Sequence, residues 1–198
     1  MAEGLFFLRV FLGVLLFAHG SQKLFGWFGG HGPDGTGGFF EQVGHRPGRQ
    51  MAILAGLSEA GGGTLLVLGL LNPLACAIII GVMVTAAVSV HGDKGLWATN
   101  GGYELPLTNA VIAGALAFTG AGSFSFDNAL GLGLSGWLWG IGAVVVGLVG
   151  AGVQLARRES AVETGADDEA TDAYPAEATA GSEQVDIPAD PASPGTTR

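Results

Sequence analysis

The segment LACAIIIGVMVTAAVSV, residues 74–90, contains no charged residue and no proline. At 1.5 Å per residue, a helix of this length spans about 26 Å, close to the hydrocarbon thickness of a bilayer. Apolar side chains cover the segment on all sides, so it lacks a polar face to turn towards water. The pattern predicts a transmembrane helix and argues against a surface helix of a soluble bundle.

Similar segments lie on both sides of it. Residues 5–25, 50–71 and 137–155 are long and apolar, and 105–122 is less strictly so. Only 13% of the 198 residues are charged, against about a quarter in typical soluble domains. We therefore expect an all-α, integral membrane helical bundle of about five transmembrane helices.

The chain divides into three predicted parts. Residues 1–135 form a four-helix membrane domain, with helices at about 5–25, 50–71, 74–90 and 105–122, and residues 136–158 add a further transmembrane helix. Residues 159–198 contain ten acidic residues and one basic residue, whereas residues 1–158 contain seven of each. Because this acidic segment has few large apolar residues, we expect a disordered cytoplasmic tail.

The nine glycines in residues 26–48 predict a loop, with a short interfacial helix around 39–43.

The basic residues predict the orientation. If the N-terminus lies outside, the cytoplasmic segments contain six of the seven basic residues of the membrane part: Lys23, Arg46, Arg49, Lys94, Arg157 and Arg158. This asymmetry follows the positive-inside rule. It places the acidic tail in the cytoplasm. The helices themselves are expected in the cell (inner) membrane of a bacterium.

Polar residues in the membrane helices indicate a site. Glu59 lies near the middle of residues 50–71, where an unpaired carboxylate would cost several kcal/mol, so it must face the interior of the bundle. His19 and Lys23, four residues apart, share one face of the first helix. Two interpretations remain: Glu59 pairs with one of these residues only to hold the bundle together, or Glu59 and His19 are catalytic and relay protons.

Further polar residues fall in the same half of the bilayer, including Thr85, Ser89 and Thr108. The candidate ligand-binding residues are Arg9, Lys23, His91, Tyr103, Glu104 and Asn109. The single Cys76 and the four histidines lack the spacing of metal ligands, so we expect no metal site. The membrane part is not basic enough to bind nucleic acid.

Several separated motifs carry a family resemblance. They are Arg9, the AHGSQKLFG of residues 18–26, Gly35-Thr36 to Phe39 with Pro47, the AGLSEAGGG of residues 55–63 with LGL at 68–70, GGYE at 101–104 and SFD at 125–127. Together, over about residues 5–130, they resemble the DoxX family. Its members are small four-helix membrane proteins named for a subunit of a thiosulfate- or quinol-oxidising system. The resemblance implies an association with membrane redox chemistry and oxidative stress, and contact with the quinone pool.

Two classes of function follow. In the first, the protein is a subunit of a membrane oxidoreductase that handles quinone or a small thiol or sulfur species, with quinone as the candidate cofactor and none attached covalently. In the second, it is a non-catalytic scaffold for soluble redox enzymes or a small-solute transporter. The expected partners are the lipid bilayer, soluble redox proteins and a second copy of the chain. The lack of a cysteine pair means that electrons must come from a partner.

Overall fold

The computed structural model describes residues 2–158, and the acidic tail predicted at 159–198 lies outside this range. Every regular element within it is a helix. In chain order these are α1 (Ala2–Phe25), η1 (Trp27–Gly29), α2 (Gly32–Gln42), α3 (Gly48–Leu68), α4 (Asn72–Ser89), η2 (Gly92–Lys94), η3 (Ala98–Asn100), α5 (Glu104–Thr119), α6 (Phe126–Ala129) and α7 (Trp137–Ala156). The expected all-helical architecture is confirmed.

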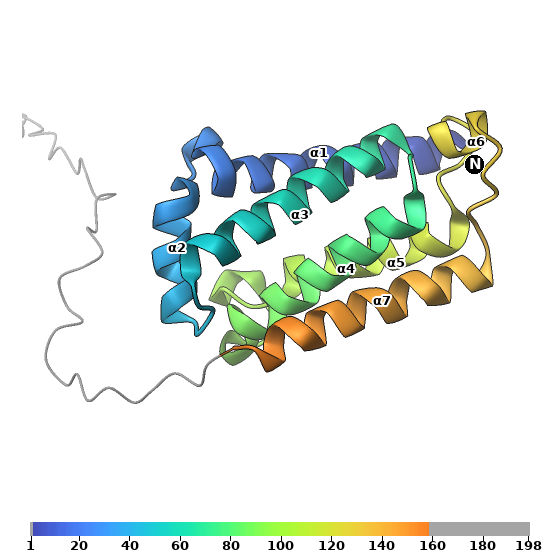
Figure 1. The fold of residues 1–198 in the computed structure, drawn as a ribbon. Helices are drawn as coiled ribbons and strands as arrows, with labels where there is room; N and C mark the ends of the chain where they lie inside the picture. The colour runs from blue at the N-terminus through green and yellow to red at the C-terminus, as the bar shows by residue number, and fades with distance from the viewer. Residues whose placement is uncertain (1, 159–198) are drawn as a thin grey trace, which may run out of the picture. The chain divides into compact units, whose positions relative to one another are not determined.

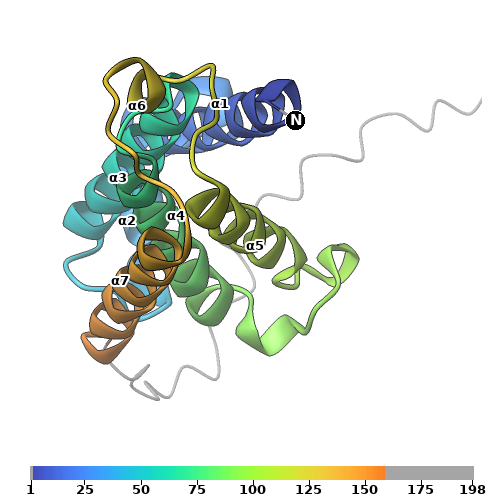
Figure 2. The ribbon, with the colours of Figure 1, turned by 90° about the vertical axis from the view of Figure 1, so that its right-hand side faces the viewer.

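The long helices α1, α3, α4, α5 and α7 run alternately up and down one bundle (Figure 1). Helix α4 lies centrally and packs against α3, α5 and α7, whereas α1 packs chiefly against α3 (Figure 2). Within residues 2–158, four helices are long and apolar enough to cross a membrane: α1, α3, α4 and α7. The chain is therefore a multi-pass membrane protein.

Helix α5 is shorter than the span predicted at 105–122. It has 16 residues and ends at Thr119, which corresponds to about 24 Å of helix. Gly120, with φ of 77°, ends it in a conformation that disfavours other residues. Apolar residues continue beyond this point, which is why the sequence pattern overestimates the helix.

The segment predicted as a glycine-rich loop contains the 11-residue helix α2. Pro33 occupies the first turn, where its missing N–H is not needed, and Asp34 complements the helix dipole there. The glycines allow a close approach: a Cβ at Gly37 would lie 2.7 Å from the backbone nitrogen of Arg49. The glycines therefore allow α2 to pack closely against the start of α3. The short helix predicted at 39–43 corresponds to the end of α2.

Glycines also bring α1 and α3 together. A Cβ at Gly13 would lie 2.6 Å from the Gly63 carbonyl oxygen, and one at Gly20 would lie equally close to that of Gly56. Membrane helices commonly associate through such small residues, because they gain little from the hydrophobic effect inside the bilayer.

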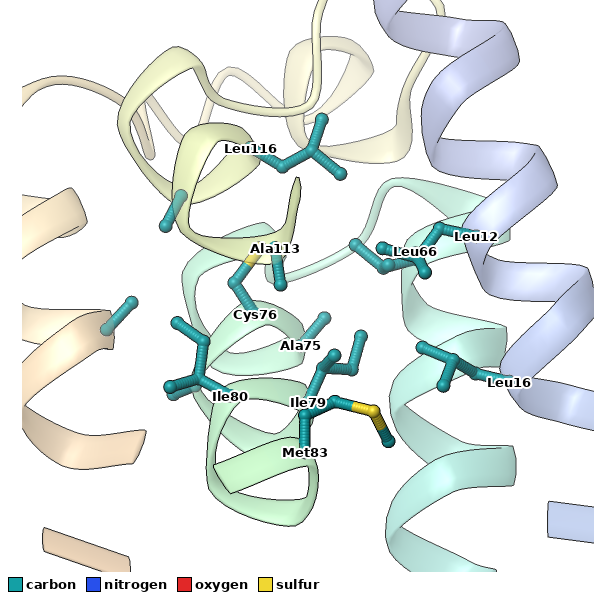
Figure 3. Packing of buried hydrophobic residues seen from close by; sticks show 13 residues of the cluster. Leu12, Leu16, Leu66, Ala75, Cys76, Ile79, Ile80, Met83, Ala113 and Leu116 are labelled. Atoms are coloured by element: carbon teal, nitrogen blue, oxygen red, sulfur yellow. The ribbon is translucent and has the colours of Figure 1, made fainter. Parts of the chain in front are cut away.

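The apolar residues around α4 form the buried core of the bundle. Cys76, Ile79 and Met83 of α4 belong to one cluster of buried residues with Leu12 of α1, Leu66 of α3 and Leu116 of α5, which surround α4 in Figure 3. Many large apolar side chains remain exposed on the outer surface, such as Phe7 and Leu138. An apolar exterior around a packed interior is what a bundle surrounded by lipid requires.

Candidate functional site

Lys23 and Glu59 form an ion pair inside the bundle. Lys23 lies in the last turn of α1 and Glu59 in the middle of α3, where it is buried. The Lys23 Nζ donates to Glu59 Oε2 at 2.5 Å. Each residue lies three positions after Gly20 or Gly56, at the close contact of the two helices. The glycine contact therefore positions the pair.

The pair lies at the edge of a large cavity. The cavity has a volume of about 680 Å³ and is bounded by α3, α4 and α7, with the end of α1 and the α2 region closing one end. Most of its wall is apolar. Its polar side chains gather towards the α2 end of the bundle: Gln22, Lys23, His31, Thr36, His45, Ser58, Glu59, Thr85, Ser89, His91 and Gln154.

His45 and Ser89 are a second buried polar pair on this cavity. His45 lies in the connection between α2 and α3, and its Nε2 shares a hydrogen bond of 2.8 Å with the Ser89 Oγ. Burial, and secondarily the charge of Arg158, lowers the pKa of His45 from its usual value, which favours the neutral imidazole. His45 was not among the predicted site residues, since it lies 44 positions from Ser89 and no local pattern joins the two.

His91 and Gln154 complete the polar end. The His91 Nδ1 shares a hydrogen bond of 2.6 Å with the Gly101 carbonyl oxygen. The Gln154 amide of α7 donates to the Met51 sulfur of α3 at 3.7 Å. Gln154 was also missed, because a single glutamine near the end of an apolar helix is an ordinary interfacial residue.

Four other candidates do not line this cavity. His19 lies on an exposed surface of α1, and Glu59 pairs with Lys23 instead. The Glu104 carboxylate accepts from the Ala98 backbone nitrogen, and the Asn109 amide donates to the Met83 sulfur. Tyr103 lines a smaller, mainly apolar hollow beside α5. The roles of these residues stay predictions, but the structure does not bring them together with Glu59.

Arg9 lies at the opposite end of the bundle. It is fully buried, and its guanidinium donates to the carbonyl oxygens of Leu66, Val67 and Phe124 at 2.6, 3.0 and 2.6 Å. The first two are carbonyls at the end of α3, where a cation is favourable. Arg9 thus ties α1 to α3 and to the connection after α5, and this places it away from the cavity.

The buried Asp127 closes the same end of the bundle. Its carboxylate accepts from the backbone nitrogens of Leu71 and Asn72 at 2.7 and 2.9 Å. These N–H groups belong to the start of α4, where a negative charge is favourable. Arg9 and Asp127 therefore hold the two sides of the α3–α4 turn.

The arrangement at the cavity suits an uncharged, partly polar molecule. Lys23 offers N–H donors, Glu59 offers acceptor oxygens, and the two charges balance each other. Among residues 2–158, no three potential ligating side chains form a group that could hold a metal ion.

Comparison with known families gives a match. A family model described as DoxX matches residues 4–92, which include α1 to α4 and a little under half of the chain. The resemblance that the motifs indicate is confirmed over this segment, while the motifs at 101–104 and 125–127 lie beyond it. Neither a curated protein nor a solved structure matches the chain.

Proposed function

We propose that the chain is a membrane subunit of a redox system that binds a quinone beside Lys23 and Glu59, on the premise that the match of residues 4–92 to the DoxX family model reflects a shared kind of function. One observation carries the proposal: a mainly apolar cavity between membrane-spanning helices ends at an ion pair whose carboxylate is buried. Cavities of about 300–1,000 Å³ with mainly apolar walls and few polar groups are typical of ligand sites.

The residues at the polar end fit the head of such a ligand. The Lys23 ammonium is the donor for a ring oxygen, and Glu59 is the adjacent acceptor for a hydroxyl hydrogen. A bound quinone supplies reversible uptake of two electrons and two protons. The role of the protein is to hold the quinone ring, to exclude water with the apolar cavity walls and to exchange protons at the Glu59 carboxylate.

The electrons come from a partner protein in this proposal. The only cysteine, Cys76, is buried in α4 between apolar neighbours, so a dithiol within one chain is excluded. A subunit that provides a membrane site for a soluble redox protein fits this composition. A small thiol or sulfur species is the second candidate substrate of that system.

We also propose the orientation. Because the helices alternate in direction, Lys23, Arg49 and Lys94 lie at the same end of the bundle as the cavity's polar groups. The excess of basic residues there supports a cytoplasmic location for this end, in a bacterial cell membrane, with the N-terminus outside.

A non-catalytic function is the alternative. The Lys23–Glu59 pair is closed and joins α1 to α3, as expected if it served only to make two buried charges tolerable. In that case the protein is a scaffold for soluble redox enzymes or passes a small solute, and the cavity contains only lipid chains.

Measuring quinone bound to the purified protein tests the proposal. Wild type in mild detergent, supplied with a membrane quinone, should retain it at close to one molecule per chain, and Glu59→Gln should lose most of it. The matched control is Arg49→Gln, because Arg49 forms an exposed ion pair with Asp34 at 2.7 Å and does not line the cavity. Wild type without quinone, or equal content in wild type and Glu59→Gln, would overturn the proposal.

A further inference from the structure

Helix α7 forms one wall of the cavity although it lies outside the matched family segment. Val146, Gly147, Gly150 and Gln154 of α7 line the cavity, whereas the match ends at residue 92. The site around Glu59 is therefore completed by a helix that the family segment does not include.

The structure fixes this wall at several points. A Cβ at Gly147 would lie 2.8 Å from the Ala77 carbonyl oxygen, so α7 packs closely on α4. At the polar end, Gln154 contacts Met51, and the Arg158 Nε donates to the Val43 carbonyl oxygen at 2.7 Å. These contacts hold α7 at a defined position opposite α3.

The cavity has the form of a groove that opens on the outer surface of the bundle. Its floor on α4 includes residues from Leu74 to Val90, which corresponds to about 24 Å along a helix. Leu54 of α3 and Val146 of α7 line its two sides and remain 45% and 60% exposed. An apolar molecule in the bilayer can therefore enter from the side, between α3 and α7.

The charges in the groove select the kind of head group. Among residues 2–158, Lys23 and Glu59 are the only Lys, Arg, Asp or Glu residues that line it, and they neutralise each other. His45 is held towards its neutral form by burial. An anionic phospholipid head would need an unpaired cation, which this lining does not offer. A neutral head with hydrogen-bonding oxygens meets the available donors and acceptors.

We propose that α7 and α3 enclose a lateral groove for the hydrocarbon tail of a neutral, quinone-class amphiphile, and that Gly150 determines how wide a tail it accepts. This rests on the proposed function, which places the ring at Lys23 and Glu59. Gly150 lines the groove, and a Cβ there meets no atom within 4 Å. A larger side chain at this position would occupy the path of the tail.

The test uses Gly150→Leu, which fills the groove without a backbone clash. Its control is Gly152→Leu, because a Cβ at Gly152 also meets no atom within 4 Å, but Gly152 does not line the groove. Val146→Phe, on the same wall, gives an independent second variant. Binding of two quinones with the same ring, one with a long isoprenoid tail and one without a tail, is measured in lipid nanodiscs.

We expect Gly150→Leu and Val146→Phe to weaken binding of the tailed quinone by about tenfold or more, because methylene groups lose buried contacts. Binding of the tailless quinone should stay within about twofold of wild type, and Gly152→Leu should match wild type for both. Unchanged tailed-quinone binding in both groove variants would overturn the groove assignment and leave the proposed function intact. Failure of wild type to bind either quinone would overturn the proposed function itself. Loss of a co-purified phospholipid, with quinone binding unchanged, would show that the occupant is a lipid and also overturn the assignment.

Discussion

His45 and Ser89 share a hydrogen bond of 2.8 Å between Nε2 and Oγ, which joins the α2–α3 connection to the last residue of α4. Both residues are buried and line the cavity that also contains Lys23 and Glu59. The neutral His45–Ser89 hydrogen bond thus lies at the same polar end of the cavity as the charged Lys23–Glu59 pair. The stability of the folded protein should therefore depend on the protonation of His45.

The protein should lose stability in mildly acidic solution because of His45. Burial and the Arg158 charge lower the pKa of His45 from its usual 6.5. Below pH 6.5 the unfolded chain therefore binds more protons than the folded chain. This contribution to the free energy of unfolding is complete above pH 6.5 and is lost progressively as the pH falls from there through the lowered pKa of the folded state.

Thermal unfolding of the detergent-solubilised protein between about pH 8 and pH 5 measures this effect. His45→Gln keeps a hydrogen-bonding group near Ser89 without a titrating proton, so its melting temperature should fall less than that of wild type over this range. Parallel pH profiles for the two proteins would show that His45 does not titrate as we infer.

Replacing Arg9 should destabilise the fold without affecting quinone binding per folded molecule. Arg9→Met leaves the carbonyl oxygens of Leu66, Val67 and Phe124 without their donor. Hydrogen bonds to charged groups contribute about 1.5–3 kcal/mol each, so we expect a loss of about 3 kcal/mol or more. Denaturation in detergent provides the measurement, and Arg49→Gln, which changes an exposed pair, should shift stability by less than about 0.5 kcal/mol.

Arg9→Lys tests whether the loss of stability comes from the lost hydrogen bonds or from the lost positive charge. It retains the positive charge but lacks the planar fork that reaches both the end of α3 and the connection after α5. Stability close to wild type would contradict the role that we assign to these hydrogen bonds.

The proposed orientation predicts which sites react with a membrane-impermeant thiol reagent in intact cells. Gly38→Cys, on an exposed position of α2, should be protected until the cells are opened. Ser123→Cys, exposed in the connection after α5, should react from outside. The native Cys76 is buried and gives little background. Labelling of Gly38→Cys in sealed cells, with protection of Ser123→Cys, would reverse the orientation.

The long helices could be predicted from sequence because continuous apolar segments have one stable solution in a bilayer. Predicted ends, such as 50–71 for α3 (Gly48–Leu68), differ by a few residues, because capping at Gly69 rather than hydropathy ends the helix. Helix α2 was not predicted over its full length. Its glycines indicated flexibility, whereas in the structure Gly37 and Gly48 allow backbone contact between α2 and α3.

The candidate site could be predicted only in part. The positions of Glu59 and Lys23 along their helices predicted a similar depth in the bilayer, and the structure joins the two residues as an ion pair. Depth alone, however, does not tell which way a helix faces. Asn109 lies on α5 and contacts Met83, away from the cavity, and His19 faces outward although Lys23 is one turn away. His45 and Gln154 needed the packing of α2 and α7, which no local pattern in the sequence specifies.

The Lys23–Glu59 pair either serves ligand binding or only holds α1 to α3. Glu59→Gln leaves the Lys23 charge without its partner, so lower stability in this single variant would fit both interpretations. The double variant Lys23→Gln/Glu59→Gln removes both charges and leaves two amides of similar size that can hydrogen-bond to each other. It therefore separates the structural role from the binding role.

The decisive measurement compares thermal stability and bound quinone in wild type, Glu59→Gln and the double variant. We predict that the double variant regains most of the stability lost in Glu59→Gln but still binds quinone at least about tenfold more weakly than wild type, because a charge-assisted donor is lost from the site. If the double variant regained stability and bound quinone as well as wild type, the pair would be structural and our central claim would be wrong.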